Sequence, residues 1–176
     1  GDVRVSEYVL NEFLADNNEN FVDVIHELDV PVGYGLGCSA AVALSLALAL
    51  NQALNSGLSK TQVAQIAHLA EIKCQTGLGD VIASYHGGFE IRTKSGAPGI
   101  GRLQKIKPKE KLEVVLICFN PISTKKFLKE KISLVNGLGG KMVQELIKTQ
   151  DMNEFQDKSI EFAQYIKVIT PKMDRV

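Results

Sequence analysis

The segment PVGYGLGCSAAVALSLALALNQAL, residues 31–54, places alternate glycines directly before the most apolar run of the chain. Leucine and alanine recur on every side of a helix drawn over residues 39–55, so this helix is expected in the core. Neighbouring elements hold a buried helix rigidly, and its first turn then fixes the loop that enters it. The sequence therefore predicts a glycine loop in a fixed position, with Ser39 where the loop meets the helix.

Glycines followed by a helix form a pattern that suits anions such as phosphate. Glycine lets the backbone turn tightly and approach a ligand closely. The first N–H groups of a helix lack partners within it, and the helix dipole favours negative charge there. Ser39 offers its hydroxyl to a phosphate or a magnesium ion, or serves only as the helix N-cap. The pattern is neither the P-loop nor the dinucleotide fingerprint, so both interpretations stay open at this point.

Apolar periodicity and capping signals divide the chain into helices and strands. Helices are expected over residues 39–55, 59–74 and 81–85, and over three further segments between residues 123 and 168. Strands are expected at the start of residues 3–14, before a short helix, and over residues 21–30, 87–94 and 112–120. Ser59 with Gln62 forms a capping box, and the glycine-rich run NGLGG at residues 136–140 is interpreted as a turn.

Charge and cysteine usage exclude several classes of protein. The chain has 20 Lys and Arg against 20 Asp and Glu, which argues against a general nucleic-acid or membrane-surface binder. Its three cysteines form no Cys-x-x-Cys pair, so a disulfide framework or structural zinc is not expected. The apolar run over residues 40–50 is shorter than the ~20 residues that span a bilayer. We expect a cytoplasmic protein without nucleic-acid or membrane partners.

Two carboxylates are candidates for phosphoryl-transfer chemistry, which needs a phosphate site, metal ligands and a group that receives the acceptor's proton. Glu71, near the end of the helix over residues 59–74, is a candidate magnesium ligand, or one residue of a solvated helix face. Asp80 closes a second glycine loop, TGLGD, and is a candidate base, or the N-cap of the helix over residues 81–85.

The segment PVGYGLGCSAAVALS resembles the second motif of the GHMP small-molecule kinases, Pro-x-x-x-Gly-Leu-Gly-Ser-Ser-Ala, with Cys38 at the first serine. Within that superfamily, residues 44–101 and the run FNPISTKKFL are similar to the archaeal pantoate kinases. The resemblance implies an α+β fold, the GHMP-kinase fold. A ribosomal-S5-like N-terminal domain is expected over residues 1–107 and a ferredoxin-like C-terminal domain over residues 108–176. Both domains are expected to be incomplete, because the family's first and third motifs are missing.

The resemblance also implies roles for individual residues. Ser39 and Glu71 match the family's magnesium ligands, and Asp80 matches the carboxylate that serves as base or orients the acceptor. Thr124 lies where related kinases place a substrate-side threonine. The triphosphate loop corresponds to Gly35, Leu36, Gly37, Cys38, Ser39 and Ala40. Arg92 is a further candidate, because a guanidinium can bind the acceptor carboxylate with two parallel bonds, or it is an outward strand residue.

The resemblance implies a kinase that uses ATP and magnesium to phosphorylate the terminal hydroxyl of pantoate, for coenzyme A synthesis. The alternatives are another hydroxyl acceptor, mevalonate or homoserine, and a non-catalytic nucleotide-binding module. The pair Glu71 and Asp80 favours catalysis, because a sensor needs no base. A homodimer is left open.

Overall fold

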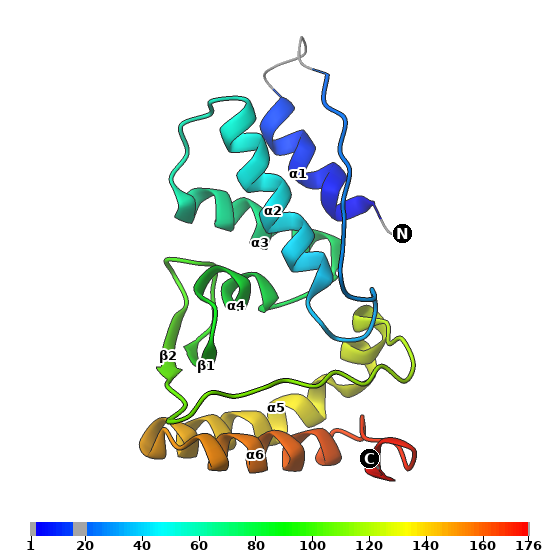
Figure 1. Ribbon diagram of the computed structural model, residues 1–176, viewed down its shortest axis with the longest axis vertical. Helices are drawn as coiled ribbons and strands as arrows, with labels where there is room; N and C mark the ends of the chain where they lie inside the picture. Colours follow the sequence, from blue (N-terminus) through cyan, green and yellow to red (C-terminus); the bar gives the residue numbers. More distant parts are fainter. Residues whose placement is uncertain (1–2, 16–20, 176) are drawn as a thin grey trace.

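The computed structural model describes residues 3–15 and 21–175 as a set of helices with one small sheet (Figure 1). In chain order the elements are α1 (Arg4–Leu14), α2 (Cys38–Ala53), α3 (Lys60–Cys74), α4 (Asp80–His86), β1 (Phe89–Lys94), β2 (Arg102–Ile106), α5 (Thr124–Thr149), α6 (Met152–Tyr165) and the 3-10 helix η1 (Met173–Arg175). This mixture confirms the expected α+β class. None of the helices in the described part combines the length and apolarity needed to cross a membrane.

The main core forms where α1, α3 and α4 pack around α2. Small alanine side chains let neighbouring helices approach closely, and leucines fill the space between them. The prediction that the helix after the glycine loop is central is therefore confirmed. The buried residues of α2 are Cys38, Ala40, Ala43, Leu44, Leu46, Ala47 and Leu50.

The capping box predicted for α3 is present. Ser59 Oγ accepts a hydrogen bond from the backbone N–H of Gln62 at 3.3 Å, and Gln62 Oε1 accepts one from the Ser59 N–H at 2.9 Å. The two bonds satisfy donors that a helix start otherwise leaves unpaired. The helix ends at Cys74, as expected, because Gln75 adopts a left-handed φ of 57°.

The strand predicted after α4 is also present. β1 pairs with β2 in an antiparallel two-stranded sheet, in which Phe89 lies opposite Ile106. A second, smaller core forms between this sheet and the last two helices, where the rings of Phe89 and Phe155 meet edge to face at 6.1 Å. The sheet therefore connects the helical core of α1–α4 to the α5–α6 pair.

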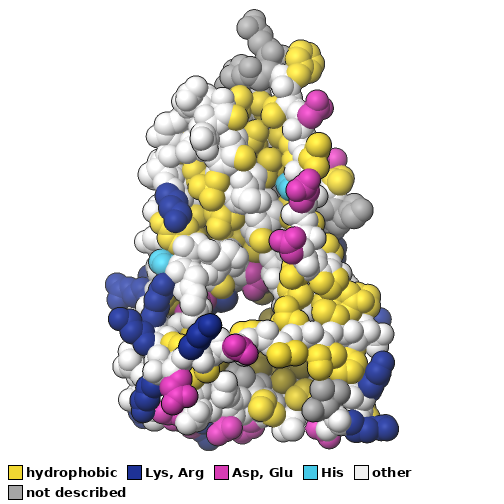
Figure 2. Space-filling model, in the orientation of Figure 1, with side chains coloured by type: hydrophobic (Ala, Val, Ile, Leu, Met, Phe, Trp, Pro, Cys, Tyr) yellow, Lys and Arg dark blue, Asp and Glu magenta, His cyan; other side chains and the backbone are white. Residues whose placement is uncertain are grey.

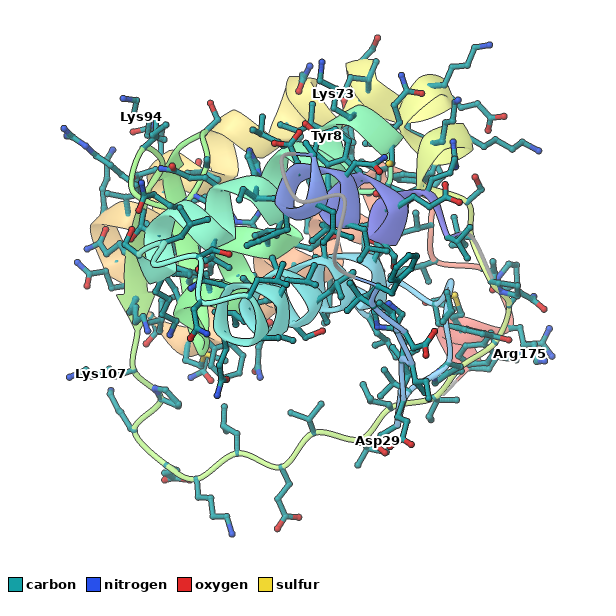
Figure 3. The ribbon with its side chains drawn as sticks, turned by 90° about the horizontal axis from the view of Figure 1, so that it is seen from above. Tyr8, Asp29, Lys73, Lys94, Lys107 and Arg175 are labelled. Carbon is teal, nitrogen blue, oxygen red and sulfur yellow. The ribbon has the colours of Figure 1, made fainter. Side chains whose placement is uncertain are left out.

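The strands predicted over residues 21–30 and 112–120 are wrong, since both segments lack regular secondary structure. Most of their apolar side chains face solvent, with Ile25 85% and Val115 84% exposed, whereas Val22 and Val24 pack against the main core. A strand needs a partner for its N–H and C=O groups, and the described residues supply none here. Seen from above, the chain from Lys107 runs outside the body toward the side of Asp29 (Figure 3). On the face shown in Figure 2, hydrophobic side chains gather over the upper, helical part of the molecule and again at the lower right.

Two interruptions predicted within helical segments are wrong. Residues 4–14 form one helix, and the described residues of 3–14 contain no strand, because Val5 and Val9 share a single buried face. The run NGLGG lies inside the 26-residue helix α5 rather than in a turn. Gly139 borders α6, where a Cβ would lie 3.5 Å from the Phe162 ring, an ordinary packing distance. Packing against α6 offsets the ~1 kcal/mol that each glycine costs a helix.

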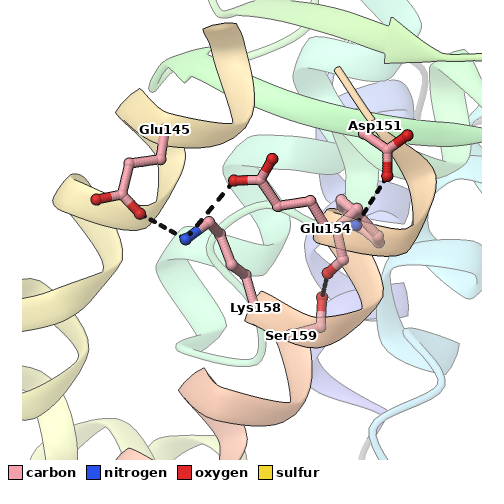
Figure 4. A network of polar contacts seen from close by, with 6 residues as sticks. Glu145, Asp151, Glu154, Lys158 and Ser159 are labelled. Carbon is pink, nitrogen blue, oxygen red and sulfur yellow. Dashed lines mark hydrogen bonds and ion pairs between the residues drawn. The ribbon is translucent and has the colours of Figure 1, made fainter. Parts of the chain in front are cut away.

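A polar network joins α5 to α6 (Figure 4). Lys158 Nζ lies 2.5 Å from Glu145 Oε2 on α5 and 3.7 Å from Glu154 Oε1 on its own helix. Asp151 caps α6 by accepting bonds from the backbone N–H groups of residues 153 and 154. The two helices therefore form one hairpin, held together close to the turn between them.

Candidate active site

The glycine loop leads into α2 with unpaired backbone donors. Gly37 occupies the N-cap position with a left-handed φ of 65° and provides no capping side chain. The first backbone bond of the helix runs from the Ala41 N–H to the Gly37 carbonyl, at 3.0 Å. The N–H groups of residues 37–40 therefore have no acceptor within the helix, which is the arrangement that binds anions.

Cys38, which replaces a serine of the motif, is buried and its thiol donates to the Pro31 carbonyl at 3.6 Å. Its side chain therefore contributes to the shape of the loop rather than to a phosphate contact. This geometry agrees with a loop that works through backbone N–H groups.

The start of α5 lies beside the glycine loop. The Ile122 N–H donates to the Gly33 carbonyl at 2.7 Å, and Ser123 caps α5 by accepting a bond from the Lys126 N–H at 3.4 Å. Thr124 is the first residue of this helix. The N-termini of α2 and α5 thus border one cavity of about 870 Å³, whose lining includes Gly35, Gly37, Ser39, Asp80 and Thr124.

Ser39, Glu71 and Asp80 come together at the base of the glycine loop. A Cβ placed on Gly77 would overlap Glu71 Oε2 and lie 3.2 Å from Asp80 Oδ2, so both carboxylates reach the same point. The Asp80 Cβ lies 3.6 Å from the position of a Cβ on Gly37. The three polar residues that the sequence selected therefore form one site beneath the unpaired N–H groups.

Asp80 is the first residue of α4 and makes no capping bond, so its predicted role as N-cap is wrong. Gly79 occupies the cap position instead, and the carboxylate of Asp80 extends toward Gly77 and the glycine loop. It is exposed and lines the cavity, where a substrate hydroxyl could reach it.

Glu71 is 1% exposed, so its interpretation as part of a solvated helix face is wrong. Thr76 Oγ1 donates to Glu71 Oε1 at 2.6 Å, whereas Oε2 has no hydrogen-bond partner among the described residues. Burial raises the pKa of Glu71; hydrogen bonds from Thr76 and Ser39 oppose this rise, and the charge of Asp80 adds to it. A carboxylate held this way lacks one partner, which a cation would provide.

The oxygen donors at this point suit a magnesium ion. Magnesium prefers hard oxygen ligands and is held in kinases by one or two carboxylates together with substrate phosphates. Within the described ranges, no group of three His, Cys, Asp or Glu side chains gathers to form a metal site of its own. Ser39 and Glu71 would therefore hold the ion beside a phosphate rather than enclose it, which leaves Asp80 facing the cavity.

Arg92 does not line the 870 Å³ cavity. Its Nε donates to Glu90 Oε1 at 2.7 Å, and its guanidinium lies against Gly79. Its side chain is 39% exposed. The structure therefore places Arg92 next to the loop of Asp80 but not among the residues around the cavity.

Sequence reasoning missed Thr76 and His26. Thr76 holds Glu71, and a threonine at the start of the TGLGD loop was a usable signal for this contact. His26 lines the cavity, with Nε2 lying 3.0 Å from Ser6 Oγ. No signal in the sequence marked it, since the histidines show no common spacing.

We expect Glu71→Gln to stabilise the protein in buffer without nucleotide or magnesium. Because the pKa of Glu71 is raised in the folded state, that state binds its proton more tightly than the unfolded chain does. The stability contributed by this group is therefore present below the unfolded value of 4.5 and falls as pH rises through the folded pKa.

Glutamine keeps the acceptor for Thr76 and provides an amide that can donate toward Asp80. Thermal unfolding across pH should show Glu71→Gln more stable near neutral pH, by on the order of 1–3 kcal/mol, the penalty of a buried polar group left unpaired. The gain should vanish at acid pH. An equal or lower midpoint for the variant at neutral pH would contradict this account of Glu71.

Comparison with known proteins identifies the class first. Residues 3–88 match the family model described as the GHMP kinases N terminal domain. This segment holds α1–α4, the glycine loop and the three polar residues beneath it. This match confirms the resemblance to the GHMP kinases carried by the glycine loop and supports the expected fold.

The more particular likeness is to pantoate kinases. The chain is 34% identical over 169 residues to the pantoate kinase of Methanocaldococcus jannaschii, covering 95% of this chain and 61% of that protein. It is 34% identical over 148 residues to the pantoate kinase of Thermococcus kodakarensis, covering 84% of this chain and 48% of that one.

A solved structure described as a phosphotransferase related to the CoA biosynthesis pathway is also similar. The two chains superpose with a TM-score of 0.73 at 28% identity. The match covers 96% of this chain and 55% of the chain in the solved structure. The chain thus spans between about half and three fifths of the lengths of these relatives.

Proposed function

We propose that the intact protein is a kinase that transfers the terminal phosphoryl group of ATP to the terminal hydroxyl of pantoate, giving 4-phosphopantoate for coenzyme A synthesis. The observation that carries the proposal is the convergence of Ser39, Glu71 and Asp80 beneath the unpaired N–H groups of α2. The relatives named as pantoate kinases support the choice of acceptor.

Each element of the site has a place in this reaction. The N–H groups of Gly35, Leu36, Gly37, Cys38, Ser39 and Ala40 would bind the ATP phosphates. Ser39 and Glu71 would hold magnesium, which when bound supplies positive charge between the phosphate oxygens. Asp80 would accept the proton of the acceptor hydroxyl. Thr124, at the start of α5, would contact the substrate on the opposite side of the cavity.

Magnesium dependence tests the role of Glu71. We expect Glu71→Gln to raise the magnesium concentration that gives half the maximal rate at least ~10-fold, equivalent to about 1.4 kcal/mol. At saturating magnesium much of the rate should return, because the amide oxygen remains a weak ligand. An unchanged magnesium requirement would assign the metal to other residues.

The full-length protein should be assayed for coupled ADP release with ATP and magnesium, comparing pantoate, mevalonate and homoserine at equal concentrations. The proposal expects the highest kcat/KM with pantoate, and phosphorus NMR should identify a phosphate monoester on its terminal oxygen. Preference for mevalonate or homoserine would retain the kinase chemistry and reject the acceptor. ATP binding without turnover of any acceptor would favour a nucleotide-binding module.

A further inference from the structure

We propose that Glu90 and Arg92 form a clamp that positions Asp80, so that Arg92 acts through the TGLGD loop instead of binding the acceptor. This inference rests on the proposed function for its catalytic consequence. Its structural basis is the contact between the Arg92 guanidinium on β1 and Gly79, the residue directly before Asp80.

The contact brings the guanidinium to the point where a side chain on residue 79 would begin. Gly79 has a φ of −164°, which is extended backbone that any residue adopts, so the backbone conformation does not require glycine. A Cβ at this position would instead overlap Arg92 Nη1 and lie 2.8 Å from Arg92 Cζ. The guanidinium therefore occupies the space that a side chain at residue 79 would need.

Glu90 fixes the guanidinium in that place. Its side chain is 9% exposed, and its Oε1 accepts the bond from Arg92 Nε at 2.7 Å. The second oxygen, Oε2, is buried and has no hydrogen-bond partner among the described residues. A carboxylate that is buried with one oxygen unpaired is stable only while its positive partner stays beside it. Glu90 therefore keeps the Arg92 guanidinium against the loop.

The clamp holds the TGLGD loop from one side while Glu71 holds it from the other. The position of a Cβ on Gly77 is filled by Glu71 Oε2, and that on Gly79 by Arg92. The backbone between these two glycines leads straight into Asp80. Because a misplacement of about 1 Å can cost ~10²-fold in rate, fixing this backbone controls whether Asp80 meets the acceptor hydroxyl.

A double-mutant cycle on the full-length enzyme tests the clamp, with Arg92→Ala, Gly79→Ala and the double variant. Each single change should lower kcat ~10- to 100-fold with KM for ATP and pantoate nearly unchanged. The double variant should be no worse than Arg92→Ala, since Gly79→Ala acts by displacing a guanidinium that is then absent. Glu90→Gln, which keeps the acceptor Oε1, should retain more activity than Glu90→Ala. Lys94→Ala, an exposed residue of the same strand, is the control.

Thermal unfolding of the same variants separates this inference from the proposed function. If the wild-type protein phosphorylates no acceptor, the proposed function fails, yet Gly79→Ala should still lower the melting temperature only when Arg92 is present. A rise in pantoate KM with unchanged kcat for Arg92→Ala would overturn the clamp and place Arg92 on the acceptor carboxylate. Additive effects in both kcat and melting temperature would overturn it as well.

Discussion

Asp80→Asn should lower kcat by ~10²–10⁴-fold, the contribution of a general base, while ATP binding remains nearly intact. Asparagine has the same shape as aspartate and preserves the close approach to Gly37. The Cβ of residue 80 lies 3.6 Å from the position that a Cβ on Gly37 would take. It cannot accept a proton from the acceptor hydroxyl. Steady-state kinetics with ATP and pantoate would measure the loss, and calorimetry would measure nucleotide binding.

A matched control is Asp151→Asn, at the N-cap of α6. Asp151 accepts bonds from two backbone N–H groups, and asparagine caps helices about equally well, so this variant should keep both stability and rate. Added magnesium should rescue Glu71→Gln but not Asp80→Asn, because Glu71 is assigned to the metal and Asp80 is assigned to the proton. If Asp80→Asn responds to magnesium in the same way as Glu71→Gln, the separate roles of metal ligand and base are wrong.

Local signals in the sequence were sufficient to predict the helices that position the site. The capping box at Ser59 predicts where α3 starts, because capping involves only residues within one turn. The apolar run over residues 40–50, interrupted only by Ser45, predicts the central position of α2, of which one side with Ser45 and Leu48 stays exposed. The convergence of Ser39, Glu71 and Asp80 came instead from the family resemblance, since periodicity and spacing carry no information about contacts between separate helices.

Features that depend on distant partners were not predictable. Residues 112–120 have the composition of a buried strand, yet a strand forms only where another strand pairs with it. The glycines of NGLGG indicate a turn locally, whereas the segment lies within α5, which packs against α6. The contact of Arg92 with Gly79 joins β1 to the start of α4, and neither residue type alone indicates it.

Gly37→Val should weaken ATP binding ~10- to 100-fold, corresponding to the loss of one hydrogen bond to a charged group, about 1.5–3 kcal/mol. Gly37 has a left-handed φ of 65° and borders the cavity in front of the unpaired N–H groups of α2. A branched side chain there would occupy the place where a phosphate must lie. It would also resist the left-handed conformation, so the variant is expected to lose some stability in addition.

Gly57→Val separates these two effects. Gly57 has a similar φ of 68°, no atom lies within 4 Å of its would-be Cβ, and it follows the opposite end of α2. Both variants should therefore lose comparable stability in thermal unfolding, because both force a β-branched residue into the same region of φ. Only Gly37→Val should lose ATP affinity in calorimetry. Equal nucleotide affinity for the two variants would mean that the phosphates bind elsewhere, and that the glycines before α2 serve only the turn of the chain.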